Sequence, residues 1–249
     1  MLRIATFNIR TSTGLDGQNS WWFRRKSCEA AIRELDADVV MLQEVRRGQL
    51  RFLRRKFSDH EFVAAGRGPR YLRGERLVIA VRTARAGKPH DSAVRWFSPK
   101  PERPGRWKGA RVNRIVLSAF VDGQQYACLH LDEAPNPNLN RCIDAIIEWF
   151  GASTVIGGDF NCRIDDPALE SLWRLGYRDA LGHLPAEGVG CASHHRFSGS
   201  LDGSRIDHLL IPGNVPVVSA EIVRNDGPRL PSDHWPVVAT VTAPTVAPE

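Results

Sequence analysis

Carboxylate, amide and imidazole side chains recur in this sequence where short apolar runs begin or end. In residues 155–166, VIGGDFNCRIDD, an apolar pair and two glycines lead directly to Asp159, and Asn161 follows two places on. Similar polar positions border other apolar runs, namely Asn8, Glu44, His130, Asp207, Asp233 and His234. Because strand ends on a rigid scaffold often form a shared cleft, these residues predict one polar site assembled from distant segments.

These residue types suit phosphoester chemistry that depends on a hard divalent cation. Mg²⁺ takes one or two carboxylates as ligands and keeps several waters. Hydrolysis of a phosphodiester needs neutralised charge, a water aligned opposite the leaving oxygen, and groups that exchange a proton. The chain has neither the HExxH zinc spacing nor the GxxxxGK[ST] phosphate loop. Each polar residue alone also fits a turn, a helix start or a core histidine, so their ordered combination is what indicates a site.

The elements that position these residues are short strands with a few helices between them. β-rich runs predict strands over 2–9, 38–42, 77–81, 114–121, 125–131, 153–157, 206–211, 216–223 and 235–241. Helical spacing predicts helices over 22–35, 46–57 and 138–150, and a short helix with Pro167 in its first turn and Asp165 or Asp166 as its cap. The Pro-rich residues 98–111 predict a long surface loop. This order favours layered α and β structure in a single domain over residues 1–249.

Charge is divided unevenly along the 249-residue chain. The total is +6, but residues 46–114 hold 20 Lys or Arg against five Asp or Glu, which gives +15 there and −9 elsewhere. This segment favours a phosphate-rich partner, although solvated Arg-rich loops have the same composition. No apolar run approaches the roughly 20 residues of a membrane span, and no signal-peptide pattern is present. Five scattered cysteines indicate reduced thiols, and together these features predict a cytoplasmic protein.

Six motifs follow one another along the chain: TFNIR, LQEV, LHLD, GGDFNC, SRIDHLL and SDHWPV. Through them the sequence resembles the endonuclease/exonuclease/phosphatase superfamily, which includes type I deoxyribonuclease and the exonuclease III-type repair nucleases. The stretch HHRFSGSLDGSRIDHLL is especially similar to bacterial members. The resemblance implies an α+β fold of four layers, in which two central mixed β-sheets pack face to face with helices outside. It also implies Mg²⁺ or Mn²⁺ as the cofactor.

The resemblance gives each matched residue a role. It makes Glu44 the principal metal ligand, with Asn8 and Asp233 beside the metal. It makes Asp159 the acid that orients or deprotonates the attacking water, and Asp207 the carboxylate that orients a histidine. The other catalytic positions that it implies, which face or position the phosphate, are His130, Asn161 and His234.

Three neighbouring features complete the predicted site. Gly157 and Gly158 are expected to let the chain turn at the sheet edge, so that the acid after them faces the substrate. Arg114, with Arg111 as its rival, is the candidate for binding substrate phosphate. Arg10 stands where the abasic-site repair enzymes carry an acid or amide, which argues against specific abasic-site cleavage.

The leading functional prediction is a metal-dependent phosphodiesterase that hydrolyses DNA. Two Arg-rich loops interleave aromatic rings with guanidinium groups, and the candidates for nucleic-acid contacts are Arg70, Tyr71, Arg73, Arg106, Trp107 and Lys108. One alternative is a phosphoesterase that acts on a small molecule or a lipid headgroup, because this fold hosts several substrate classes. Another is a non-catalytic nucleic-acid-binding module. Neither a membrane nor an obligate protein partner is expected.

Overall fold

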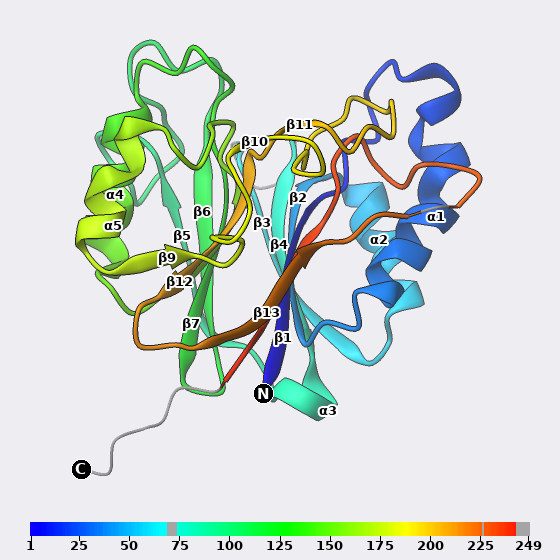
Figure 1. Ribbon diagram of the computed structural model, residues 1–249, viewed down its shortest axis with the longest axis horizontal. Coiled ribbons are helices and arrows are strands. Elements are labelled where there is room, and N and C mark those ends of the chain that lie inside the picture. The colour runs from blue at the N-terminus through cyan, green and yellow to red at the C-terminus, as the bar shows by residue number, and fades with distance from the viewer. Residues whose placement is uncertain (69–73, 226, 243–249) are drawn as a thin grey trace.

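Two six-stranded β-sheets form the centre of the computed structural model, which describes residues 1–68, 74–225 and 227–242 (Figure 1). The first sheet contains, in spatial order, β13 (Val217–Ile222), β14 (Val237–Val241), β1 (Leu2–Asn8), β2 (Val39–Val45), β4 (Arg76–Arg82) and β3 (His60–Gly66). The second contains β5 (His90–Trp96), β6 (Ile115–Val121), β7 (Gln124–His130), β8 (Val155–Asp159), β12 (Asp207–Pro212) and β9 (Tyr177–Asp179). Each sheet is mixed, because β1–β2 and β7–β8 are parallel and the other pairs are antiparallel.

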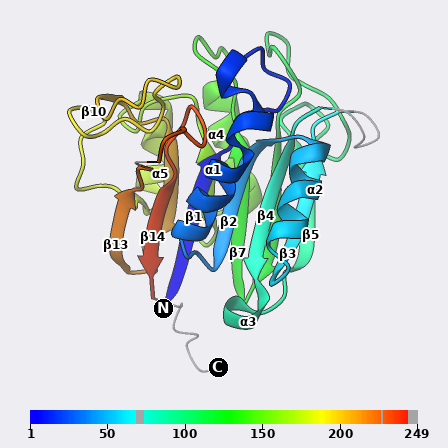
Figure 2. The same ribbon diagram turned by 90° about the vertical axis from the view of Figure 1, so that its right-hand side faces the viewer.

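Helices cover the outer face of each sheet, as Figures 1 and 2 show. The first sheet carries α1 (Trp21–Glu34) and α2 (Arg47–Lys56), and the second carries α4 (Leu139–Phe150) and α5 (Glu170–Arg174). The one-turn helix α3 (Thr83–Ala86) follows β4. A short 3₁₀ helix begins at Pro167, where the Asp166 side chain accepts a hydrogen bond from the Ala168 amide, so the predicted start and cap are confirmed.

Apolar side chains fill all three spaces between these layers. Met41 of the first sheet and Leu209 of the second belong to one buried cluster between the sheets. On the outer side of the first sheet, Val40 packs in a cluster with Ile32 of α1 and Leu53 of α2. A third cluster joins the second sheet to α4 and α5. The predicted four-layer fold, with two central mixed sheets and helices outside, is therefore confirmed.

The nine predicted strands and the main helices are present with small shifts at their ends, but several strands were missed. The larger two, β3 and β5, each lie at the edge of a sheet. The first three residues of β5 are exposed, so its sequence HDSAVRW lacks the apolar alternation of a half-buried strand. The very short β10 (Glu187–Gly188) and β11 (Gly203–Ser204) pair only with each other.

The two glycines before Asp159 do not form the predicted turn, because both lie inside β8 between two paired strands. A Cβ atom on Gly157 would lie 2.4 Å from Cε of Met41 in the opposite sheet. A Cβ atom on Gly158 would lie 2.2 Å from the carbonyl oxygen of Leu129 in the neighbouring strand. The glycines are therefore needed for close packing beneath the site.

The parallel strand pairs bring polar strand ends to one edge of the molecule. Asn8 is the last residue of β1, and the two parallel strands β7 and β8 end together at His130 and Asp159, which are partners in the register. The antiparallel strand β12 begins at Asp207, opposite Asp159. In Figure 1 this edge lies at the top, opposite the N-terminus. None of the helices within the described ranges is long and apolar enough to cross a membrane.

Candidate active site

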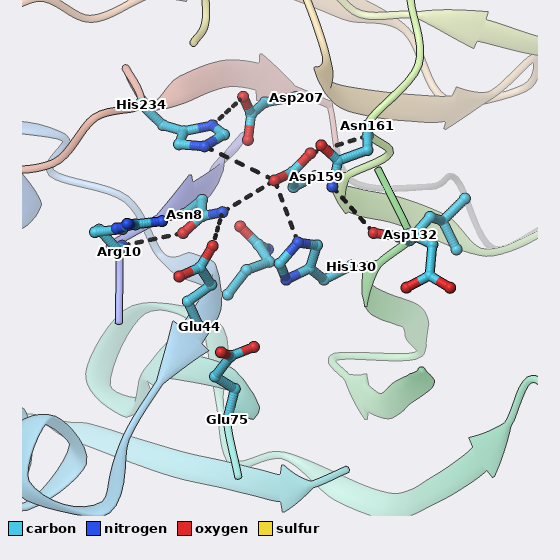
Figure 3. Close-up of polar contacts among 12 residues, drawn as sticks. Asn8, Arg10, Glu44, Glu75, His130, Asp132, Asp159, Asn161, Asp207 and His234 are labelled. Atoms are coloured by element: carbon cyan, nitrogen blue, oxygen red, sulfur yellow. Dashed lines mark hydrogen bonds and ion pairs between the residues drawn. The ribbon is translucent and has the colours of Figure 1, made fainter. Parts of the chain in front are cut away.

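The buried Asn8 side chain links the two sheets at the centre of the site (Figure 3). Its Nδ2 atom donates hydrogen bonds to Oε1 of Glu44, at 3.1 Å, and to Oδ2 of Asp159, at 2.9 Å. Its Oδ1 atom accepts one from the backbone amide of Arg10, at 3.0 Å. The other Glu44 oxygen accepts from the Thr11 amide at 2.9 Å. One amide therefore holds carboxylates from both sheets in place.

A buried histidine lies between two aspartates on the far side of Asp159. Nδ1 of His234 is 2.8 Å from Oδ2 of Asp207, and Nε2 is 3.8 Å from Oδ2 of Asp159. The Ser193 hydroxyl donates to the same Asp207 oxygen at 2.8 Å. Burial lowers the pKa of His234, but the neighbouring carboxylates, Asp207 above all, outweigh it and raise the pKa to about 10. Asp207 thereby favours the protonated form of His234, in which Nδ1–H points to Asp207 and Nε2–H faces the site.

Asp159 is an acid crowded by other groups of the site. Burial, followed by the charge of Asp207, raises its pKa to about 7. The backbone amide of Asn161 donates to Oδ1 of Asp159 at 2.9 Å, and Nε2 of His130 lies 3.5 Å from Oδ2 of Asp159. Burial and the charge of Arg114 lower the pKa of His130. The neutral form of His130 is therefore favoured at neutral pH.

Three residues of the site have left-handed backbone conformations. The φ angles are +52° at Arg10, +60° at Glu44 and +52° at Asn161. Such conformations are uncommon for residues other than glycine and often cluster at functional sites. At Glu44, the hydrogen bonds from Asn8 and the Thr11 amide hold the side chain in this backbone setting.

The buried donor set fits a cation. Asp159 and Asp207 are both buried, and one oxygen of Asp207, Oδ1, has no hydrogen-bond partner among the described residues. Close carboxylates repel one another unless a proton or a cation lies between them. Two groups have ligand atoms within 4.8 Å of one another: Asp159, Asp207 and His234, and His194, Asp233 and His234. Among the predicted ligands, Asp233 belongs to the second group, whereas Glu44 belongs to neither and accepts a hydrogen bond from Asn8.

A cavity of about 820 Å³ opens over these residues. All the predicted carboxylates except Asp207 line it, as do His130, Asn161 and His234. Six carboxylates and two arginines face this space, and none of the described residues of the basic segment 46–114 lines it. The lining residues are Arg10, Asp16, Glu44, His130, Glu133, Ala134, Asp159, Asn161, His194–Ser198, Ser200, Asp202, Ser204, Ile206, Asp233 and His234.

Neither predicted phosphate-binding arginine lines this cavity. Nε of Arg114 donates to the buried Asp132 at 2.8 Å, and the exposed Arg111 pairs with Glu133 at 3.2 Å. Arg114 does lie in a small neighbouring cavity with Glu44 and His130. The phosphate-binding roles of both arginines remain predictions.

The predicted nucleic-acid contacts fall into three groups. Arg70, Tyr71 and Arg73 lie outside the described residues. Trp107 is half-buried, with its ring centre 6.2 Å from that of Phe97, and packs against the third apolar cluster. This packing competes with the predicted stacking on bases. Only two of the six, Arg106 and Lys108, are exposed side chains in the described part of the chain.

Sequence reasoning missed cationic and aromatic groups of the cavity. Arg10 is held by Asp16, with its Nη2 2.9 Å from Oδ1, and its Nε lies 3.7 Å from Oδ2 of Asp233. His194 stacks on His234 with ring centres 4.4 Å apart, and the exposed Arg196 follows two residues later. The consecutive polar residues His-His-Arg before the predicted strand 206–211 were the available signal.

The sequence pattern of the Endonuclease/Exonuclease/phosphatase family matches residues 5–234. The chain belongs to this family, whose members are metal-dependent phosphoesterases. No curated protein matches it significantly.

Solved structures of proteins with different names share the fold over almost the whole chain. A Bacteroides vulgatus protein named for the same family is 26% identical, with a TM-score of 0.85, and the match covers 97% of this chain and 98% of that one. A mannosyl-6-phosphatase from Bacteroides thetaiotaomicron is 21% identical, with a TM-score of 0.85 and coverages of 98% and 100%. D. rerio TDP2, complexed with a single-strand DNA product, is 19% identical, with a TM-score of 0.71 and coverages of 97% and 99%.

Proposed function

We propose that this protein hydrolyses phosphoesters with a divalent metal, by in-line attack of water on phosphorus. The arrangement of His234 between Asp207 and Asp159 carries the proposal. In it, Asp159 orients the attacking water and accepts its proton, because its carboxylate is buried beside two imidazoles and its pKa lies near neutrality. His234, oriented by Asp207, donates to a phosphate oxygen from Nε2.

Two more side chains position the phosphate in this mechanism. His130, held neutral by burial and the charge of Arg114, donates a single hydrogen bond to a phosphate oxygen. Asn161 lies beside the acid on the strained backbone after β8, and its Nδ2 donates to the carbonyl of Leu131 at 3.0 Å. Asn161 lines the cavity, and in this mechanism its side-chain oxygen accepts a hydrogen bond from the attacking water.

Glu44, Asn8 and Asp233 would hold the metal, Mg²⁺ or Mn²⁺, with oxygen ligands. When bound, such a cation neutralises phosphate charge and polarises the ester. The Asn8 oxygen retains one lone pair for this purpose, since the other accepts from the Arg10 amide. The nearby group of His194, Asp233 and His234 offers nitrogen ligands, which favour Mn²⁺ over Mg²⁺.

The lining of the cavity favours a small phosphoester or a phosphorylated headgroup as substrate. Six carboxylates against two arginines make a poor track for the polyanionic backbone of DNA, even with one divalent cation bound. The cation, Arg10 and the histidines supply enough positive charge and hydrogen-bond donors to bind a single phosphate. One similar structure is named as a sugar phosphatase, which agrees with this choice.

DNA is the second candidate, favoured by the +15 charge of residues 46–114. Arg106 and Lys108 are exposed on the loop that precedes β6. The Lys108 carbonyl accepts a hydrogen bond from Asn138, so this loop packs near the residues that follow β7. A strand of DNA would then cross the site from this basic loop, and cleavage would weaken steeply with salt.

A substrate panel tests the proposal. Wild-type protein and Asp159→Ala are assayed with Mg²⁺, Mn²⁺ or EDTA on sugar phosphates, nucleotides, soluble phosphodiesters, and linear and circular DNA. Metal-dependent turnover that falls at least about 100-fold in the variant supports the mechanism. Turnover of small esters while DNA stays uncut supports the first substrate class. Cleavage of circular DNA would make the protein an endonuclease. Folded wild-type protein that turns over nothing in any lane would contradict hydrolysis and favour a non-catalytic binder.

A further inference from the structure

Large apolar side chains are exposed around the mouth of the candidate active site. In the part of the chain that the structure describes, seven such side chains are exposed. Met1 and Val218 lie at the opposite edge, since Leu2 and Val217 are both register partners of Val241. The other five are Leu15, Trp22, Phe23, Val189 and Leu201. We call these five residues the apolar rim.

The three aliphatic rim residues come from two loops that border the same cavity. Leu15 precedes Asp16, and Leu201 lies between Ser200 and Asp202, all three of which line the cavity. Val189 is next to Gly190, whose amide donates to Asp202 at 3.1 Å. Figures 1 and 2 both place these loops on the edge where β1 ends. Two segments far apart in the sequence thus expose apolar groups beside one opening.

The aromatic rim residues open α1 and are tied to the loops of the site. Helix α1 is anchored through Arg24, whose guanidinium donates to the carbonyl of Arg10 at 2.7 Å and lies 5.8 Å from the ring of Phe197, a residue of the cavity wall. Trp22 and Phe23 lie on the outer side of this anchor, with 67% and 55% of their surfaces exposed. Their exposure is therefore not the fraying of a loose terminus.

Cations are interleaved with the apolar rim. The Arg25 guanidinium lies 3.9 Å from the ring centre of Trp22, and that of Arg229 lies 5.5 Å from the ring centre of Phe23. Lys26 on the same helix and Arg196 in the cavity lining are also exposed. Of the acids on the same loops, Asp16 is paired with Arg10, whereas Asp202 accepts the Gly190 amide and has no ion pair within the described part of the chain. The rim therefore combines apolar side chains with four cations, while the six carboxylates face the cavity that it borders.

We propose that the apolar rim docks the protein, reversibly, on the surface of an anionic lipid bilayer with the site facing the lipids. Trp, Phe and aliphatic side chains beside Arg and Lys are the groups that enter the interfacial layer of a membrane. Single-stranded nucleic acid fits less well, because Leu15, Val189 and Leu201 have no ring on which a base could stack. Docking stands independently of catalysis; that the substrate is then a lipid phosphoester rests on the proposed function.

Vesicle co-sedimentation of the metal-free full chain tests docking without catalysis. The variants are Leu15→Ser and the double substitution Trp22→Ser with Phe23→Ser, and Val218→Ser is the matched control, an exposed apolar residue at the opposite edge. Wild type and the control should bind phosphatidylglycerol-containing vesicles more tightly than phosphatidylcholine vesicles. The double variant should lose about tenfold or more in partitioning, because two large apolar groups no longer enter the interface. Thermal melting of each variant checks that it is folded.

Three results would overturn docking. Docking is contradicted if the wild-type protein sediments with neither kind of vesicle. Equal losses in the control and the double variant would show that binding does not use the rim. Binding to a single-stranded oligonucleotide that the double variant loses, with no binding to vesicles, would make the rim a nucleic-acid surface. Turnover of a soluble phosphoester is measured separately, so docking and hydrolysis can fail independently.

Discussion

Nδ1 of His234 lies 2.8 Å from Oδ2 of Asp207, and the opposite nitrogen of the same ring points toward Asp159, 3.8 Å away. The three side chains come from the loop before β14, the start of β12 and the end of β8, so this alignment depends on both sheets being in register. A histidine oriented in this way by one acid holds its other ring nitrogen toward the reacting groups, where it can act in hydrogen bonding or proton transfer.

Replacing Asp207 by Asn should reduce kcat by about 100-fold or more, because the amide can no longer hold the His234 tautomer or stabilise its charged form. The change keeps the volume of this fully buried side chain. Steady-state hydrolysis of a soluble phosphodiester with Mn²⁺ measures the effect. Since Ser193 also contacts Asp207, Ser193→Ala serves as a milder companion, expected to lose less than Asp207→Asn. Wild-type kcat in Asp207→Asn would remove the orienting role.

Replacing Glu44 by Gln should weaken Mn²⁺ binding by about 10- to 100-fold, since an anionic ligand becomes neutral at nearly unchanged shape. Calorimetric titration of the metal measures this without substrate, and the rise in Tm on adding metal should shrink in parallel.

His194→Ala is the comparison that locates the metal. If the oxygen ligands dominate, this variant should keep wild-type affinity within a few-fold. A larger loss in His194→Ala than in Glu44→Gln would instead place the ion in the group of His194, Asp233 and His234.

Gly158→Ala should lower stability by about 1–3 kcal/mol, because its Cβ would lie 2.2 Å from the Leu129 carbonyl oxygen and the paired strands must move apart. In a chain of this size, each kcal/mol corresponds to roughly 2–4 °C in Tm. Gly48→Ala is the control: a Cβ there meets nothing within 4 Å, and its helical position should make the variant as stable as wild type or slightly more stable. Equal Tm values for Gly158→Ala and wild type would mean that β7 and β8 move apart without loss of stability.

Arg24→Met should destabilise the protein by about 3 kcal/mol or more, because buried carbonyl groups lose their donor. The Arg24 guanidinium donates to the carbonyls of Ile9, Arg10, Asn19 and Pro231 at 2.7–2.9 Å. Urea unfolding measures the change. Arg25→Met, next in sequence and partly exposed, should shift the unfolding midpoint much less. Similar shifts in both variants would assign the loss to helix α1 in general.

Much of the fold was predictable because burial leaves a periodic record in the sequence. The central strands β1, β2 and β8 are buried nearly throughout and begin with apolar runs or alternation, and the buried positions of α1 recur at helical spacing. The edge strands β3 and β5 were missed because they bury only part of their length, so polar residues interrupt the pattern.

The candidate active site was also predictable only in part. The sequence by itself determined which chemical groups are available, since Asn8, His130 and Asp159 each stand where a buried strand must end. Only the tertiary structure decided which of them meet. Asp207 reaches His234 because β12 is antiparallel to β8, whereas no described residue of the basic segment lines the cavity. Strand ends are local properties of a chain, but distances between them are set by the packing of two sheets, which no local pattern encodes.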